Sequence, residues 1–301
     1  MSASKNYLAI FGLLFGAVCW GVIWYPYRLL QEAGIFGVAS SFYTYSVAVI
    51  IGSLFFLRDW RGVFNQPKIV FLLALCAGWT NLSYVLAVID GEVMRVMLLF
   101  YLSPLWTLIL AHFWLKERIE LHGVVTIAVS LLGALIMLTN VFDGKGNWLP
   151  VPQSNAEWLA FSAGVGFACT NVISRKSNQL SVATKSMSVW LGAVFVALML
   201  MPIQSASIPL PTTLSLMTWG LILMIALILI TATLFVQYGV TKITATRASV
   251  IFLFELVVAS IASYYLADEV MEPHEWLGGF LIVAAALYAA WSDDRAKQSA
   301  S

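Results

Sequence analysis

Long apolar runs separated by short polar loops make up almost the whole chain. A membrane-spanning helix needs about 20 mostly apolar residues. Ten runs of that kind can be identified, at 7–27, 37–57, 69–89, 93–115, 121–140, 157–175, 186–203, 215–238, 246–267 and 275–292. They fall five and five on either side of the longest polar stretch, 143–157. The pattern therefore predicts an all-α integral membrane protein with ten transmembrane helices.

The second half of the chain repeats the first at a constant offset of 152 residues. The matching residues are Arg95, Phe100, Ile109, Glu117, Glu120 and His122 in the first copy, and Arg247, Phe252, Ile261, Glu269, Glu272 and His274 in the second. Because each half contains an odd number of spans, the two copies must have opposite orientations in the membrane. We predict two inverted five-helix repeats, at 1–145 and 154–293. Inverted repeats are typical of secondary transporters, in which the halves move around a shared site near the bilayer midplane.

The composition agrees with this class of protein. Hydrophobic residues make up 61% of the chain and charged residues 10%, and the mean hydropathy is +0.88. Soluble domains contain about 25% charged residues. The net charge of +1 gives no support for a nucleic-acid partner, which would need a basic face or arm. The three cysteines lie inside apolar runs, and no phosphate loop or metal-ligand cluster is found, so we expect no cofactor and no transport driven by ATP at this chain.

The basic residues predict the orientation. With both termini in the cytoplasm, 13 of the 16 Lys and Arg residues lie on the inner side. Only Arg28, Arg95 and Lys145 would then lie outside. An excess of positive charge in cytoplasmic loops is the rule for membrane proteins, so we predict that both termini are cytoplasmic.

Four local motifs resemble a known family. The first half has Asn81-x-x-Tyr84, a short turn at 90–92, the segment 101–105 and a Glu117 that closes the fourth span. The second half has 237–239, the turn 242–244, the segment 254–256 and Glu269. This unit resembles the EamA-like repeat of the drug/metabolite transporter superfamily. The aromatic-rich segment 100–106 looks most like the bacterial amino-acid exporter branch. In the second copy Leu256 stands where the first has Pro104.

The resemblance implies a ten-span transporter in the bacterial inner membrane that exports amino acids, aromatic ones included, or other small metabolites. It implies no enzymatic activity. Other solutes on the same fold, such as sugars, drugs or polyamines, remain open. An intramembrane enzyme would need clustered catalytic groups, and a channel would need a ring of like residues; neither pattern is present. Substrate identity, direction, proton coupling and oligomeric state are left open.

Glu255 is the clearest candidate for a functional side chain. It is the tenth residue of the ninth expected span, and no basic residue is close on its own helix. A carboxylate inside a membrane is costly unless it is paired, protonated or facing water, so it marks a functional site by default. We expect Glu255 either to contact a substrate amine or to titrate in proton coupling. The structural alternative is a neutral acid that locks two helices together.

Other polar and aromatic residues within the apolar runs are candidates to line the same cavity. Aromatic walls suit apolar, aromatic and cationic solutes. The expected substrate-binding set is Trp20, Trp24, Trp79, Asn81, Tyr84, Tyr101, Asn171, Gln237, Phe252 and Glu255. For the polar members, hydrogen bonding between helices is an equally good explanation.

Two tight turns at equivalent places are candidate gates. The hairpins 90–95 and 242–247 each end in an arginine, Arg95 in the first and Arg247 in the second. With Glu92 and Pro104, these arginines form the expected gating set, although both could also be anchors at helix ends. Glu117 and Glu269 close helices at one repeat position and are interpreted as structural.

Overall fold

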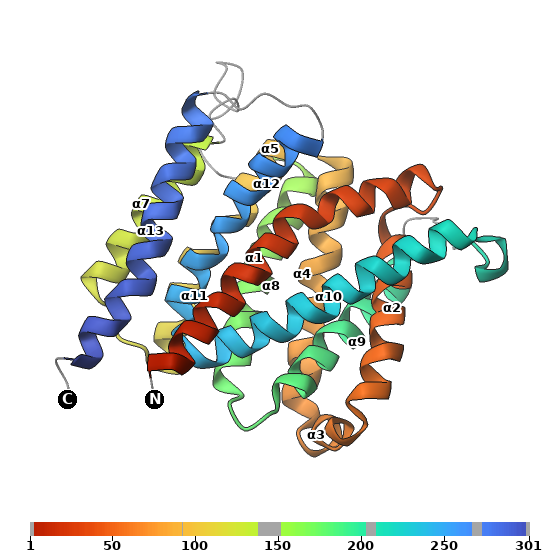
Figure 1. Cartoon of the computed structure of the whole chain (residues 1–301), viewed down its shortest axis with the longest axis horizontal. Coiled ribbons are helices and arrows are strands. Elements are labelled where there is room, and N and C mark those ends of the chain that lie inside the picture. Colours follow the sequence, from red (N-terminus) through yellow and green to blue (C-terminus); the bar gives the residue numbers. More distant parts are fainter. Residues whose placement is uncertain (1–2, 92, 138–151, 203–208, 267–272, 299–301) are drawn as a thin grey trace.

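The computed structural model describes residues 3–91, 93–137, 152–202, 209–266 and 273–298, and Figure 1 shows their arrangement. All described residues lie in helices or in the segments that join them, and none forms a strand. Among the described residues, seven helical segments are long and apolar enough to cross a membrane. They are α1 (Ala3–Glu32), α2 (Gly37–Phe55), α4 (Pro67–Asp90), α8 (Asn155–Lys176), α9 (Val182–Leu200), α10 (Leu216–Lys242) and the consecutive pair α11 (Ala245–Phe252) and α12 (Phe254–Leu266).

Three shorter apolar segments occupy the remaining expected positions. They lie in α6 (Ser103–Leu110) with its continuation η2 (Ala111–Leu115), in α7 (Leu121–Met137) and in α13 (Pro273–Gln298). Each of the ten apolar runs thus overlaps helix within the described residues. The chain is a multi-pass membrane protein, and the number of ten crossings stays a prediction.

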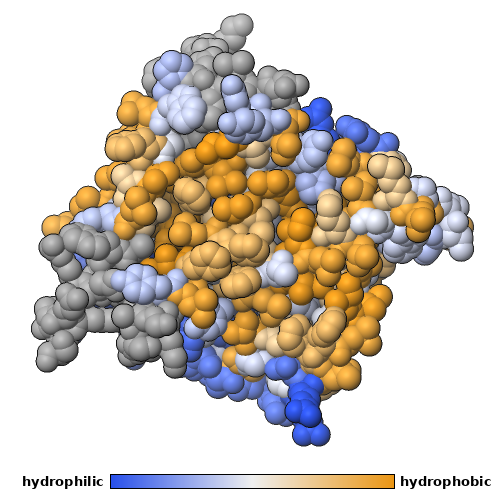
Figure 2. Space-filling model, viewed as in Figure 1, coloured by the Kyte–Doolittle hydropathy of each residue, from blue (hydrophilic) through white to orange (hydrophobic). Residues whose placement is uncertain are grey.

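The outer surface of the helices is apolar, as a lipid environment requires. Phe55 is 79% exposed, Leu121 80% and Leu216 89%. Figure 2 shows apolar side chains over most of the face in view, with strongly hydrophilic ones at its upper right and along its lower edge. That edge carries the short helix α3 (Trp60–Asn65), which follows η1 (Leu57–Asp59) in the connection between α2 and α4.

Helices of the first half pack mainly on helices of the second half. α1 lies along α10, and α4 lies along α8 (Figure 1). In the repeat, α1 corresponds to α8 and α4 to α10. Replacing each helix by its counterpart therefore turns the α1–α10 pair into the α8–α4 pair. The pairs α2 with α9 and α7 with α13 map onto themselves under the same exchange. The packing therefore has the pattern that a two-fold relation between the halves would produce.

The crossings between the halves are close because glycines stand at them. A Cβ added at Gly12 of α1 would lie 2.8 Å from the backbone oxygen of Phe235 in α10. A Cβ added at Gly164 of α8, the equivalent position, would lie 2.8 Å from the backbone oxygen of Phe100. Small residues allow such backbone contacts between membrane helices, where lipid provides no hydrophobic drive for association.

Two of the expected spans are interrupted. The run 93–115 consists of α5 (Val93–Phe100) and α6, with a break at Tyr101 and Leu102. The run 246–267 breaks at Leu253, between α11 and α12. Both breaks contain tighter i to i+3 bonds: the amide of Leu102 donates to the oxygen of Leu99 at 3.4 Å, and the amide of Leu253 donates to that of Val250 at 3.1 Å.

The two breaks lie at equivalent positions of the repeat. Pro104 stands in the first turn of α6 and accounts for the first break, because proline cannot donate a helix hydrogen bond. The second break has Leu256 at that position, so proline does not account for it. Each of these two expected spans thus consists of two helical segments, and 245–266 still counts as one apolar stretch long enough to cross a membrane.

Candidate functional site

The two helix breaks define the centre of the candidate site. Tyr101 lies in the first break and is buried, and Glu255 lies in the first turn of α12, directly after the second break. The backbone of α1 closes one side, since a Cβ at Gly21 would lie 2.8 Å from the carbonyl oxygen of Glu255. Glu255 is surrounded by protein, yet part of its surface is accessible. A side chain enclosed in this way does not lie on the lipid-facing surface of the bundle.

Two tyrosines of the first half lie close to this carboxyl group. Tyr84 of α4 and Tyr101 are both near enough to Glu255 to feel its charge. A phenol can donate a hydrogen bond to a carboxylate, and the acid comes from the opposite half of the chain. The group can hold a proton or a cationic ligand between the halves.

A line of aromatic rings connects the two halves beside Glu255. The ring centroids of Tyr84 and Phe100 are 4.7 Å apart, those of Phe100 and Phe167 5.7 Å, and those of Phe167 and Phe252 5.2 Å. Phe100 and Phe252 occupy the same repeat position, and Phe167 of α8 contacts both. Tyr101 adds a ring 5.5 Å from Phe100. The centre thus combines one acid with an aromatic wall.

Of the predicted substrate-binding residues, the structure brings together Tyr84, Tyr101, Phe252 and Glu255. Trp20 and Trp79 pack instead against the apolar cluster formed by α2, α9 and α10. Trp79 Nε1 donates to Ser162 Oγ at 3.1 Å, and Asn81 Nδ2 donates to Tyr45 Oη at 2.9 Å. These bonds connect helices, in line with the structural alternative for these two residues.

Three further candidates carry buried polar atoms without a protein partner among the described residues. These atoms are Asn171 Nδ2, Gln237 Oε1 and Trp24 Nε1. Asn171 and Gln237 are each only 3% exposed. Buried polar groups in proteins are nearly always hydrogen-bonded, so water or a solute is the expected partner at these positions.

The predicted gating residues are only partly described. Glu92 lies outside the described residues, and Arg95 lies in α5 with a side chain that is outside the described part. Pro104 is buried in the first turn of α6. Arg247 lies in the first turn of α11, where its charge reaches Glu117.

Sequence reasoning missed a polar network at the end of the bundle that carries α3 and the α8–α9 connection, which we call the basic end. Lys185 is fully buried in the first turns of α9. Its Nζ donates to the backbone oxygen of Ser174 at 2.7 Å and to Thr241 Oγ1 at 2.8 Å. In the sequence it reads as an ordinary loop lysine, because it adjoins a polar loop and its burial depends on α8 and α10.

Glu117 belongs to the same network. Its Oε1 lies 3.7 Å from Arg175 Nε, and the carboxylate also accepts a hydrogen bond from the backbone amide of Ala245. Burial raises the pKa of Glu117, and the positive charges of Arg175 and Arg247 and the amide oppose this shift. Burial of the ionised carboxylate is therefore unfavourable, and the two arginines and the amide compensate part of that cost.

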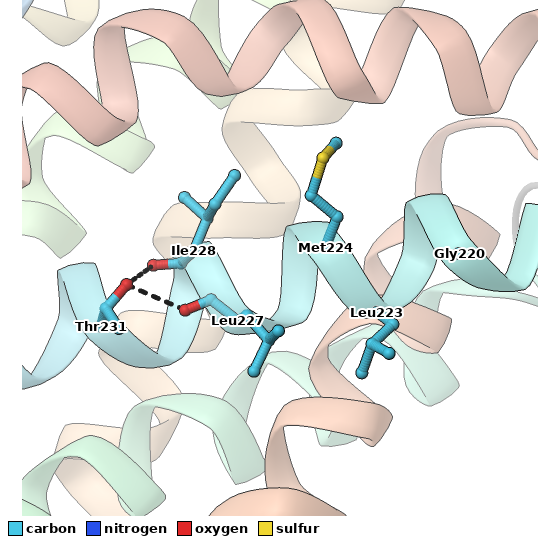
Figure 3. A pocket seen from close by; sticks show the side chains of 6 residues that line it. All are labelled: Gly220, Leu223, Met224, Leu227, Ile228 and Thr231. Atoms are coloured by element: carbon cyan, nitrogen blue, oxygen red, sulfur yellow. Dashed lines mark hydrogen bonds between the residues drawn. The ribbon is translucent and has the colours of Figure 1, made fainter.

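A hollow on the outer surface is not the candidate site. It has a volume of about 410 Å³ and is lined entirely by α10, as Figure 3 shows, from Gly220 to Thr231. The Thr231 hydroxyl in it bonds to the backbone oxygens of Leu227 and Ile228 of its own helix. The hydroxyl hydrogen is thus already donated within the helix, and the hollow offers a solute no free polar hydrogen. Nor do three or more His, Cys, Asp or Glu side chains gather in a possible metal site within the part of the chain that the structure describes.

Comparison with protein families decides the class. The model of the EamA-like transporter family matches residues 7–139 and 154–291, once in each half. The chain belongs to the EamA-like transporter family. The two matched segments carry the two helix breaks at equivalent positions.

Known proteins add the fold but no substrate. Protein RarD of Streptomyces exfoliatus is 23% identical over 176 residues, which is 56% of this chain and 52% of that protein. The chain thus aligns with only about half the length of this relative. A crystal structure of a protein that is 16% identical covers 98% of this chain with a TM-score of 0.74, and is itself covered completely. At that identity the likeness establishes the fold alone.

Proposed function

We propose that this EamA-like transporter is a secondary transporter that exports small amine-bearing metabolites, most of all amino acids and among them aromatic ones, across a bacterial inner membrane. The observation that carries this proposal is the Glu255 carboxyl group at the centre of the bundle, facing Tyr84 and Tyr101 of the other half. A carboxylate with phenol neighbours suits an ammonium group, and the aromatic line beside it suits an apolar side chain.

The arrangement of the halves supports alternating access. The paired packing of α1 with α10 and of α4 with α8 fits two inverted five-helix repeats, and the broken helices meet at the interface between them. Discontinuous helices at a repeat interface are where secondary transporters place their binding sites. Movement of one repeat against the other would expose the Glu255 site to each side in turn, with both termini in the cytoplasm.

Counterflow in proteoliposomes tests the proposal. Vesicles loaded with one unlabelled amino acid are given a trace of labelled amino acid outside, and saturable uptake that depends on the internal solute is expected. Competition by analogues that lack one charged group then compares the contributions of the amine and of the carboxylate to binding. Removal of the amine is expected to weaken competition about ten- to a hundred-fold, as for loss of a charge-assisted hydrogen bond, and more than removal of the carboxylate does.

Glu255→Gln is the decisive variant, with Glu32→Gln as its control. Glu32 is an exposed acid at the end of α1, 3.9 Å from Arg28. We expect Glu255→Gln to lose amino-acid counterflow and Glu32→Gln to keep it. Wild-type transport by Glu255→Gln with an unchanged pH dependence would reject the role of Glu255. If no amino acid exchanges, the amino-acid proposal fails, and sugars, polyamines and drugs are the next solutes to test.

A further inference from the structure

Charged and hydroxyl side chains connect the two halves at the basic end. Glu117, which follows η2 in the first half, contacts two elements of the second half: Arg175 at the end of α8 and the amide of Ala245 at the start of α11. The Glu117 side chain is 19% exposed and that of Arg175 is 29% exposed. The pair is therefore largely shielded, and water does not substitute freely for either partner.

A second connection lies on the other side of the same end. Asp59 of η1 accepts a hydrogen bond from Ser181 through Oδ1, and its backbone oxygen accepts one from Thr184 Oγ1 at 3.1 Å. The backbone of α3 is close as well, because a Cβ at Gly62 would lie 2.6 Å from Thr184 Oγ1. The start of α9 is thus held against the α2–α4 connection of the first half.

Glu117 also joins the outer ends of the two broken helices. The segment that ends before Glu117 begins at Ser103, next to Tyr101, and α11 runs from Ala245 to Phe252, just before Glu255. The Glu117 contacts and the central site therefore lie at opposite ends of the same two helical segments. At the opposite end the described bond between the halves is neutral, from the Tyr43 hydroxyl to the oxygen of Pro209.

We propose that the Glu117–Arg175 and Asp59–Ser181 contacts form a two-point latch that holds the basic end of the transporter closed and separates once in each transport cycle. This inference rests on the proposed function, in which that end is the cytoplasmic one. Glu117, Arg175 and Asp59 act as positioning residues, and none of them touches the solute.

Lys185 provides a contrast within the same network. Its bonds to Ser174 and Thr241 connect α8, α9 and α10, all of which belong to the second half. Such a contact makes one half rigid and does not oppose its separation from the other. The latch and the Lys185 contact should therefore give different results in an experiment that measures the distance between halves.

Distances between spin labels test the latch without a solute. In protein with Cys19, Cys76 and Cys169 replaced by alanine, labels are placed at Asn65 of α3 and Lys176 of α8, both of which are exposed. In protein with the latch residues unchanged, pulsed electron–electron double resonance is expected to give one short distance between the two labels. Glu117→Ala and Asp59→Ala are each expected to raise the ratio of long to short distances about ten-fold, as for loss of one or two hydrogen bonds.

Two controls complete the design. Glu32→Gln breaks an ion pair within one helix and is expected to leave the distances unchanged, as is Lys185→Met. An unchanged distribution in both latch variants, or an equal shift in Glu32→Gln, would overturn the latch. Counterflow is measured on the same samples: a distance shift without exchange of any solute counts against the proposed function alone, and exchange with unshifted distances counts against the latch alone.

Discussion

The contact between α4 and α9 allows a quantitative test of how tightly the halves are packed. Gly192 of α9 faces the backbone of α4, and a Cβ at this position would lie 1.9 Å from the oxygen of Ala74 and 2.5 Å from its carbonyl carbon. From the other side, a Cβ at Gly78 would lie 2.2 Å from the oxygen of Gly192. Both obstacles are backbone atoms, which no rotamer change can move.

The size of the effect follows from these distances. Non-bonded contacts of carbon have their optimum at about 3.5 Å, so Gly192→Ala would have to push the two helices apart by roughly 1.5 Å. Overpacking of this kind costs about 1–3 kcal/mol. We expect a fall in Tm of several degrees and a loss of exchange activity, because α4 carries Tyr84 into the central site.

Gly220→Ala is the matched control, since nothing lies within 4 Å of a Cβ at that position of α10. Alanine is favoured over glycine in a helix by about 0.8–1.0 kcal/mol, so this variant is expected to be neutral or slightly more stable. Thermal unfolding of both variants in one detergent gives the comparison. Equal Tm values for Gly192→Ala and wild type would refute the claim that the halves meet backbone to backbone.

Three further predictions concern single groups. Burial raises the pKa of Glu117 in the closed state, although Arg175 and Arg247 face it and the His112 ring lies on its carbonyl oxygen, so closure of the basic end takes up a proton. Lowering the pH from 7 to 5 should therefore decrease the fraction of molecules with the long spin-label distance in wild type but not in Glu117→Gln. An increase in that fraction would contradict the prediction. Lys185→Met leaves the Ser174 oxygen and Thr241 hydroxyl without their donor, and should destabilise the protein by about 1–3 kcal/mol in thermal unfolding; an unchanged Tm would show that water replaces the amine. Tyr101→Phe keeps the ring but removes a hydroxyl near Glu255, and should weaken solute affinity about three- to ten-fold in counterflow at an unchanged Tm; unchanged affinity would exclude the hydroxyl from binding.

The positions of the helices follow from the sequence because lipid imposes a simple requirement. A spanning helix must present apolar side chains over about 20 residues, and every expected run overlaps helix within the described residues. Glu255 could be identified for the same reason, since a lone carboxylate is conspicuous in an apolar run. Its neighbours Tyr84 and Tyr101 could only be grouped with it by analogy, because they come from the other half of the chain.

The helix breaks and the basic end needed the structure. Pro104 gives a signal for the first break, but Leu253 lies in a sequence without proline or glycine, and its break depends on packing around α12. Lys185 and Arg175 look like ordinary basic residues of a cytoplasmic loop. Whether such a residue is exposed, or buried against Ser174 and Thr241, depends on where α8, α9 and α10 end relative to one another.

The duplication of the fold does not extend to the chemistry of the centre. The position that holds Glu255 in the second half holds Ser103 in the first, although the helix breaks beside both. The charged group is therefore supplied by one half and its phenol partners Tyr84 and Tyr101 by the other. A solute can shift a conformational equilibrium only as far as it binds the two states differently. In the proposed cycle, movement of the halves would change the distance between Glu255 and both tyrosines. A bound amine would then meet a different set of partners in each state, and solute binding would thereby be linked to the movement of the repeats.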